Sequence, residues 1–112
     1  MRFHIPIKLP SLLNLRMSWR AMKQLKTAQK EATAICMMKA KETETVPPMP
    51  VTVVITRNGP RALDDDNLTG ACKYVRDTIA DILGIDDGSD EYTWVCKQRI
   101  GRYGVDVDIS SR

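Results

Sequence analysis

The chain has 112 residues, of which 43% are hydrophobic and 28% charged, and its formal net charge is +3. This length and composition predict one folded domain and exclude wholesale disorder or two independent cores. No apolar run approaches the roughly 20 residues that cross a bilayer. The first residues also lack the apolar core of a secretory signal, so we expect a cytoplasmic protein without a membrane segment.

The number and spacing of cysteines and histidines limit the kinds of catalytic or metal site that the chain can form. Cys36, Cys72 and Cys96 are widely spaced, and His4 is the only histidine. This pattern argues against a disulfide framework and a zinc site. Catalysis by a serine or cysteine nucleophile with a histidine base would have to use His4, whose position in an apolar, strand-like stretch argues against that mechanism. Hydrolytic chemistry would therefore depend on carboxylates, lysines or a hard metal ion.

The charge is divided unevenly along the chain. Residues 1–50 hold nine Lys and Arg against three Glu, a net charge of +6, whereas residues 51–112 hold eight Lys and Arg against eleven Asp and Glu, a net charge of −3. A basic half suits phosphates and an acidic half suits cations.

The first half of the chain predicts a strand, a helix and a second strand. Residues 2–9 alternate apolar and polar side chains, and Pro6 restricts this strand to an edge or a bent position. Residues 17–41 form the longest predicted helix, whose apolar stripe we expect to face the core: Trp19, Met22, Leu25, Ala28, Ala32 and Ile35. Three prolines make residues 42–50 a connector, and residues 51–56 read as a buried strand that ends at residues 58–60.

The second half predicts a helix followed by two strands. The helix covers residues 67–83, and Gly84 stands where a glycine ends helices. A turn at 85–90 leads to a strand at 92–99, and the glycines at 101 and 104 predict a hairpin turn into a last strand at 105–109. The order β-α-β-α-β-β indicates a single α+β domain over residues 1–112, with two main helices and a small mixed sheet.

Basic side chains lie on the other face of the first predicted helix. They are Arg16, Arg20, Lys23, Lys26 and Lys30. A solvated helix face explains such a stripe, and so does a surface that contacts phosphates.

Two acidic clusters flank the second predicted helix. Residues 64–67 read Asp-Asp-Asp-Asn before it, and Asp86 and Asp87 follow it. Caps and turns account for single aspartates, but three in succession repel one another unless a cation is present. A helix of about 17 residues is roughly 25 Å long, so both clusters share one metal only if the following loop folds back. The spacing does not fit a calcium loop, and two or three carboxylates with water suit magnesium better.

The helix also places carboxylate and ammonium groups on one stripe. Asp66, Gly70, Lys73 and Asp77 follow at three- and four-residue steps, opposite the apolar face. Lys73 could pair with Asp77 as a surface salt bridge or reach a phosphate.

These segments resemble the RusA family of Holliday junction resolvases, which carries an Asp-x-Asp-Asn-Leu motif opening a helix, a lysine within it, and an Asp-Asp pair beyond it. The matching residues are 64–68, Lys73 and 86–87, and the proline-containing exit of the first strand (residues 5–14) also fits. The resemblance implies that Asp64, Asp66 and Asp87 bind Mg²⁺ and that Lys73 is the catalytic lysine. The family lysine would fall near Gly70, so Lys73 lies about one turn later.

The resemblance further implies a homodimer that hydrolyses phosphodiesters in branched DNA, specifically four-way junctions. Seven basic residues would contact the DNA backbone: Arg16, Arg20, Lys23, Lys26, Lys30, Arg57 and Arg61. We expect Trp19 and Trp94 in the core rather than stacked on bases. Two alternatives stay open: a RusA-like protein that binds branched DNA without cleaving it, and a prophage structural or interaction protein whose aspartates serve as caps and turns.

Overall fold

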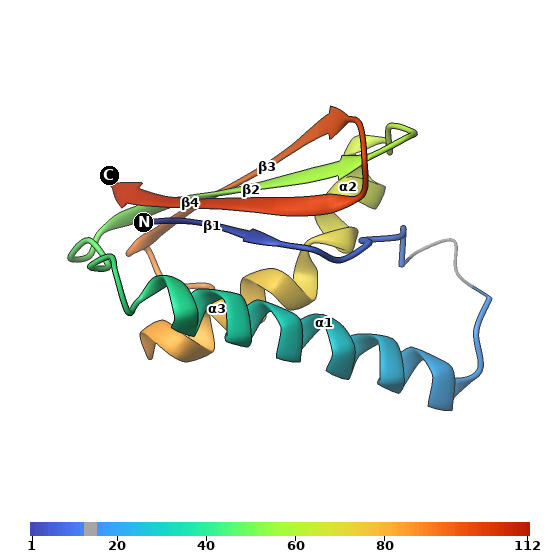
Figure 1. The fold of residues 1–112 in the computed structure, drawn as a ribbon, viewed down its shortest axis with the longest axis horizontal. Helices are drawn as coiled ribbons and strands as arrows, with labels where there is room; N and C mark the ends of the chain where they lie inside the picture. The colour runs from blue at the N-terminus through green and yellow to red at the C-terminus, as the bar shows by residue number, and fades with distance from the viewer. Residues whose placement is uncertain (13–15) are drawn as a thin grey trace.

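The computed structural model describes residues 1–12 and 16–112 and has a four-stranded mixed sheet with helices against one face (Figure 1). It is one compact α+β domain, as the sequence predicts, with three helices rather than two. Positions 13 and 14 of the proline-containing exit lie outside the described residues. The elements are β1 (Arg2–Ile5), α1 (Trp19–Ala40), β2 (Val51–Gly59), α2 (Asp65–Ala71), α3 (Lys73–Leu83), β3 (Tyr92–Ile100) and β4 (Gly104–Ser111).

The strands lie in the order β1-β4-β2-β3. The last strand, β4, is antiparallel to both β1 and β2, whereas β2 and β3 are parallel. The predicted hairpin between the last two strands is therefore wrong, because β2 lies between them. Their short connection passes the end of β2, where the Gly101 N–H donates to the Gly59 carbonyl at 2.9 Å.

All four strands differ in length from the predictions, and for β1 and β2 the strand pairing gives the reason. β2 continues to Gly59 because Arg57 and Asn58 pair with β3 on one side and with β4 on the other. β1 ends at Ile5 instead of continuing to residue 9, since Pro6 has no N–H for a ladder. As predicted, β1 lies at an edge of the sheet.

The helix α1 lies within two residues of the predicted bounds at each end, but a different face is buried. Gln29, Thr33 and Met37 lie inside at four-residue steps, whereas Trp19 is 78% exposed and Ile35 is 68% exposed. The expectation that Trp19 belongs to the core is wrong. The helix packs against β1 and α3, and its N-terminal turns project away from the sheet, so nothing in the described structure covers Trp19 (Figure 1).

The second predicted helix is divided at Cys72 into α2 and α3. The Cys72 backbone has φ −86° and ψ −1°, at the edge of helical geometry, and Gly70, a weak helix former, lies two residues before it. Hydrogen bonds from Cys72 N–H to Leu68 O and from Arg76 N–H to Cys72 O keep the two helices continuous. Gly84 ends α3 at φ +77°, as predicted.

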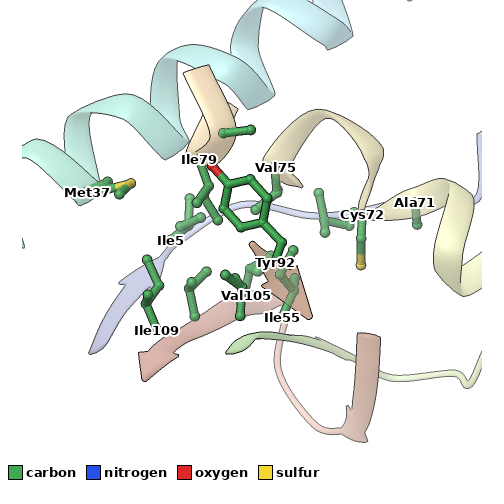
Figure 2. Packing of buried hydrophobic residues seen from close by; sticks show 14 of the residues in the cluster. Ile5, Met37, Ile55, Ala71, Cys72, Val75, Ile79, Tyr92, Val105 and Ile109 are labelled. Carbon is green, nitrogen blue, oxygen red and sulfur yellow. The ribbon is translucent and has the colours of Figure 1, made fainter. Parts of the chain in front are cut away.

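The hydrophobic core lies between the sheet and the helices. Figure 2 shows Ile5, Val105 and Ile109 of the sheet facing Val75 and Ile79 of α3. Tyr92 crosses this layer and donates its hydroxyl to the Ile85 carbonyl at 2.9 Å, which holds the loop after α3 against β3. No helix among the described residues is long and apolar enough to cross a membrane.

Candidate nucleic-acid interface

Lysines from two helices meet around one aromatic ring. Lys26 Nζ of α1 lies 5.6 Å from the centre of the Tyr74 ring, and Lys73 Nζ of α3 lies 6.0 Å from it. Lys23 Nζ lies 5.3 Å from the centre of the Trp19 ring. These distances are within the range of cation–π attraction. The packing of α1 on α3 thus joins the basic stripe to Lys73, and Lys23, Lys26 and Lys73 form one surface, which we call the lysine surface.

The other predicted DNA contacts divide into exposed and occupied side chains. Arg16, Arg20 and Arg61 are exposed. Lys30 is partly buried and pairs with Asp81, with Nζ 3.7 Å from Oδ2. Its charge is therefore partly neutralised within the molecule.

Arg57 differs from the prediction most clearly. It is 5% exposed, and its guanidinium donates to Leu9 O at 2.7 Å and to Arg61 O at 3.0 Å. A Cβ at Gly59 would lie 3.1 Å from Arg57 Nη1, so a glycine lets the guanidinium lie flat against β2. Arg57 joins the exit of β1 to the end of β2, and this buried position leaves little of its side chain exposed for the predicted DNA contact.

The Asp-Asp-Asp-Asn segment lies where β2 gives way to α2. Asp64 caps α2, and its Oδ1 accepts from Asn67 N at 2.9 Å and from Asn67 Nδ2 at 2.8 Å. The Ser11 hydroxyl donates to Asn67 Oδ1 and ties this turn to the segment after β1. Asp65 and Asp66 are exposed in the first turn. Asp64 therefore has the helix-cap role that the alternative of caps and turns gives to one of these aspartates.

Asp87 lies in the loop after α3 and is fixed by contacts with α3 and β3. Its carboxylate Oδ2 lies 3.5 Å from Arg76 Nε, and its carbonyl accepts from Trp94 Nε1 at 2.8 Å. Burial, with the charges of Asp87 and Asp86, raises the pKa of Tyr92 above its ordinary value. Trp94 stacks on Tyr92 with ring centres 4.7 Å apart, so the expectation that Trp94 packs with the core is confirmed.

The loop after α3 folds back along that helix. Asp87 faces a hollow of about 540 Å³. This hollow has four carboxylates and one lysine in its wall: Asp77, Asp81, Asp86, Asp87 and Lys30. The fold-back that the metal hypothesis requires thus brings Asp87 alongside α3, where it pairs with Arg76 near the start of that helix.

The structure does not unite the predicted metal ligands. Asp64 and Asp66 lie at the start of α2, whereas Asp87 lies beside α3. Within residues 1–12 and 16–112, no three Asp, Glu, His or Cys side chains lie close enough together to hold a metal ion. The donor groups suit Mg²⁺ in kind, but these three do not form one site in this arrangement.

Two thiols lie under the junction of α2 and α3. The hydrogen bond between Cys72 and Cys96, together with burial, raises the pKa of Cys72. The same hydrogen bond, assisted by the charge of Arg76, lowers the pKa of Cys96 to about 7. Both cysteines are free thiols, as the sequence predicts.

Three residues of this region were not predicted from the sequence. Tyr74 directly follows Lys73, which the sequence analysis singled out, so its position next to a candidate site residue could have drawn attention to it. Its contact with Lys26 depends on how α1 packs on α3 and has no local sequence signal. Arg76 is the partner of Asp87. Trp19 was expected in the hydrophobic core.

In comparisons with known proteins, no family model matches this chain, and neither a curated protein nor a solved structure matches it.

Proposed function

We propose that this chain is a RusA-like, structure-selective endonuclease that hydrolyses phosphodiesters in four-way DNA junctions. In this proposal it acts in the cytoplasm as a homodimer, with Mg²⁺ as its cofactor. The observation that carries it is the lysine surface, because Lys26 of the basic stripe and Lys73, the first residue of α3, flank the same ring, Tyr74. The aspartates of α2 lie on the helix that continues into α3, which carries Lys73, and this combination suits an enzyme that binds phosphates and uses carboxylates.

The proposed roles follow the residue chemistry. Asp66, exposed in the first turn of α2, is free to act on a ligand, and Asp64 is close to it at the cap. Mg²⁺ would supply charge stabilisation and an acidified water. We derive no step through an ion held jointly by Asp64, Asp66 and Asp87, because these side chains do not form one site. In this proposal Lys73 binds a phosphate, a role that its position beside Lys26 at Tyr74 supports.

A second candidate is a RusA-like protein that binds branched DNA without cutting it. Two predicted ligands already have partners within the molecule, since Asp64 caps α2 and Asp87 pairs with Arg76. Gly70 also stands where the family motif has its lysine. These observations favour DNA binding over catalysis. They do not affect the argument that the lysine surface binds DNA.

The test is incubation of the purified protein with a synthetic four-way junction or a matched linear duplex, in Mg²⁺ or EDTA. The key variant is Asp66→Asn. Asp65→Asn is its matched control, because Asp65 is equally exposed in the same turn and is not an aspartate of the motif. We expect symmetric, Mg²⁺-dependent nicking of the junction that Asp66→Asn abolishes and Asp65→Asn retains.

The outcomes separate the candidates. Salt-sensitive, junction-selective binding without nicking would favour the second candidate. Absence of both nicking and binding would overturn both and leave the aspartates as caps and turns. Sedimentation of the protein with and without the junction tests the homodimer in the same samples.

A further inference from the structure

An exposed tryptophan lies at the edge of the lysine surface. Trp19 is the first residue of α1 and is 78% exposed, which is unusual for so large an apolar ring. Lys23, one turn later, lies over its face at 5.3 Å. Trp19 contributes little to the core and is available to an external ligand.

A second ring lies across the same hollow. Tyr74, in the first turn of α3, lines a hollow of about 290 Å³ together with Trp19, Met22, Lys23 and Lys26. This volume is near the lower end of small-molecule sites, roughly 300 Å³, so the hollow suits one planar group rather than a duplex groove. Two helices that are distant in sequence therefore present an aromatic ring each to one space.

Lysine side chains make this hollow positively charged. Lys23 and Lys26 lie in the wall of the hollow, and Lys73 lies over Tyr74 at 6.0 Å. Among the residues that the structure describes, no acidic side chain lines it. Aromatic faces combined with cations form the typical site for unpaired nucleotides, because bases stack on rings while the backbone phosphates meet the lysines. Bases within a duplex are already stacked and cannot enter such a hollow.

We propose that Trp19 and Tyr74 form a stacking site for an unpaired nucleobase, with Lys23, Lys26 and Lys73 on the adjoining phosphates. This inference rests on the proposed function in one respect, since it names which part of a branched DNA the lysine surface receives: nucleotides unpaired at the branch point. The site binds by stacking and charge, so it has little base preference.

The test uses the full chain and a single-stranded oligothymidine of about 12 nucleotides, compared with a duplex of equal length. Tryptophan fluorescence reports stacking, and anisotropy of a labelled strand reports affinity. Trp19→Phe removes the reporter but keeps a ring, while Trp94 remains as an internal reference. Trp19→Ala removes the ring from an exposed position, and circular dichroism confirms that the fold is retained.

We expect single strands to quench the wild-type fluorescence and duplex to leave it almost unchanged. The quenching should disappear in Trp19→Phe. Trp19→Ala should weaken single-strand binding by roughly ten- to a hundredfold, and Trp19→Phe by less. Lys39→Ala, an exposed lysine in the last turn of α1, is the charge control and should have a small effect, whereas Lys26→Ala should also reduce the salt dependence.

Several results would overturn the inference. These are equal quenching by duplex, unchanged affinity in Trp19→Ala, or quenching only by vesicles of phosphatidylserine and phosphatidylcholine. The junction assay separates this inference from the proposed function. Junction nicking without any change in Trp19 fluorescence would overturn the stacking site alone. Stacking of single strands on Trp19 without junction nicking or junction selectivity would overturn the proposed nuclease and support the stacking site.

Discussion

His4 and Asp106 join the edge strand β1 to β4, with His4 Nδ1 2.7 Å from Asp106 Oδ1. Asn58 Nδ2 of β2 donates to the other carboxylate oxygen at 2.8 Å, so Asp106 connects three strands. A Cβ at Gly104 would lie 2.6 Å from His4 Cε1, so the absence of a side chain at Gly104 allows the ring to lie there. The only histidine of the chain thus has a structural partner.

The first prediction concerns the pH dependence of stability. Partial burial acts to raise the pKa of Asp106, but hydrogen bonds from His4 and Asn58, with the charge of Arg99, outweigh it and lower that pKa. A carboxyl whose folded pKa is lowered stabilises the fold above its unfolded pKa of about 3.9, and this stability disappears as the pH falls through the folded value. Asp106→Asn should therefore be less stable than wild type at pH 7, and the difference should shrink below about pH 4.

Urea unfolding from pH 7 to pH 2.5 measures this difference. The control is the same substitution in a His4→Ala background, where the loss at pH 7 should be smaller because one partner is already absent. A difference between Asp106→Asn and wild type that does not change with pH would contradict the assignment.

The second prediction separates the structural and DNA-binding roles of Arg57. Arg57→Leu should lower the free energy of unfolding by about 1–3 kcal/mol, because it leaves the Leu9 carbonyl without its donor in a buried position. Arg61→Leu, an exposed neighbour that accepts from Arg57 only through its backbone carbonyl, should have little effect on stability. Denaturant unfolding gives both values. Weaker DNA binding in Arg57→Leu with unchanged stability would restore the DNA-contact interpretation.

Features decided within a few residues were predictable from the sequence. The helix over 17–41, the end of α3 at Gly84 and a cap at the start of α2 each depend on spacing and caps within about one turn. The long helix was predicted to within two residues and the end at Gly84 correctly, and the cap at α2 was one of the interpretations that the sequence left open.

Features decided by distant contacts were not predictable. The pairing of β4 with β2 depends on a choice between two neighbours, and the short glycine-containing link is compatible with either. The inward face of α1 depends on packing with β1 and α3, so Trp19, which we expected inside, is exposed, and Gln29 is buried. The lysine surface exists for the same reason, because no local pattern reports that Lys26 meets Tyr74.

The third prediction follows from the polar residue inside α1. Gln29 is 2% exposed, and neither its amide nitrogen nor its amide oxygen has a hydrogen-bond partner in the described part of the chain. An unpaired buried amide costs free energy that an apolar side chain of similar shape does not. Gln29→Met should raise the free energy of unfolding by roughly 1–2 kcal/mol. Thermal unfolding should show a higher midpoint, and Gln24→Met at an exposed position should show no gain.

The fourth prediction concerns Lys73. Its position over Tyr74, shared with Lys26, predicts a phosphate contact. Lys73→Ala should weaken binding to junction and single strand alike and reduce the slope of affinity against salt by about 1. At saturating DNA, any nicking activity should be mostly retained. Nicking lost at saturation with unchanged affinity would instead identify Lys73 as the catalytic lysine that the family resemblance implies.

The fifth prediction concerns the thiol pair beneath the α2–α3 junction. The hydrogen bond from Cys72 and the charge of Arg76 stabilise the Cys96 thiolate and lower its pKa to about 7. In a Cys36→Ala background, alkylation of Cys96 by iodoacetamide should rise steeply between about pH 6 and pH 8, where the thiolate forms. Removing the donor in Cys72→Ala should move this rise to higher pH, which peptide mass spectrometry can follow. An unchanged pH profile in Cys72→Ala would show that the neighbouring thiol does not lower the pKa of Cys96.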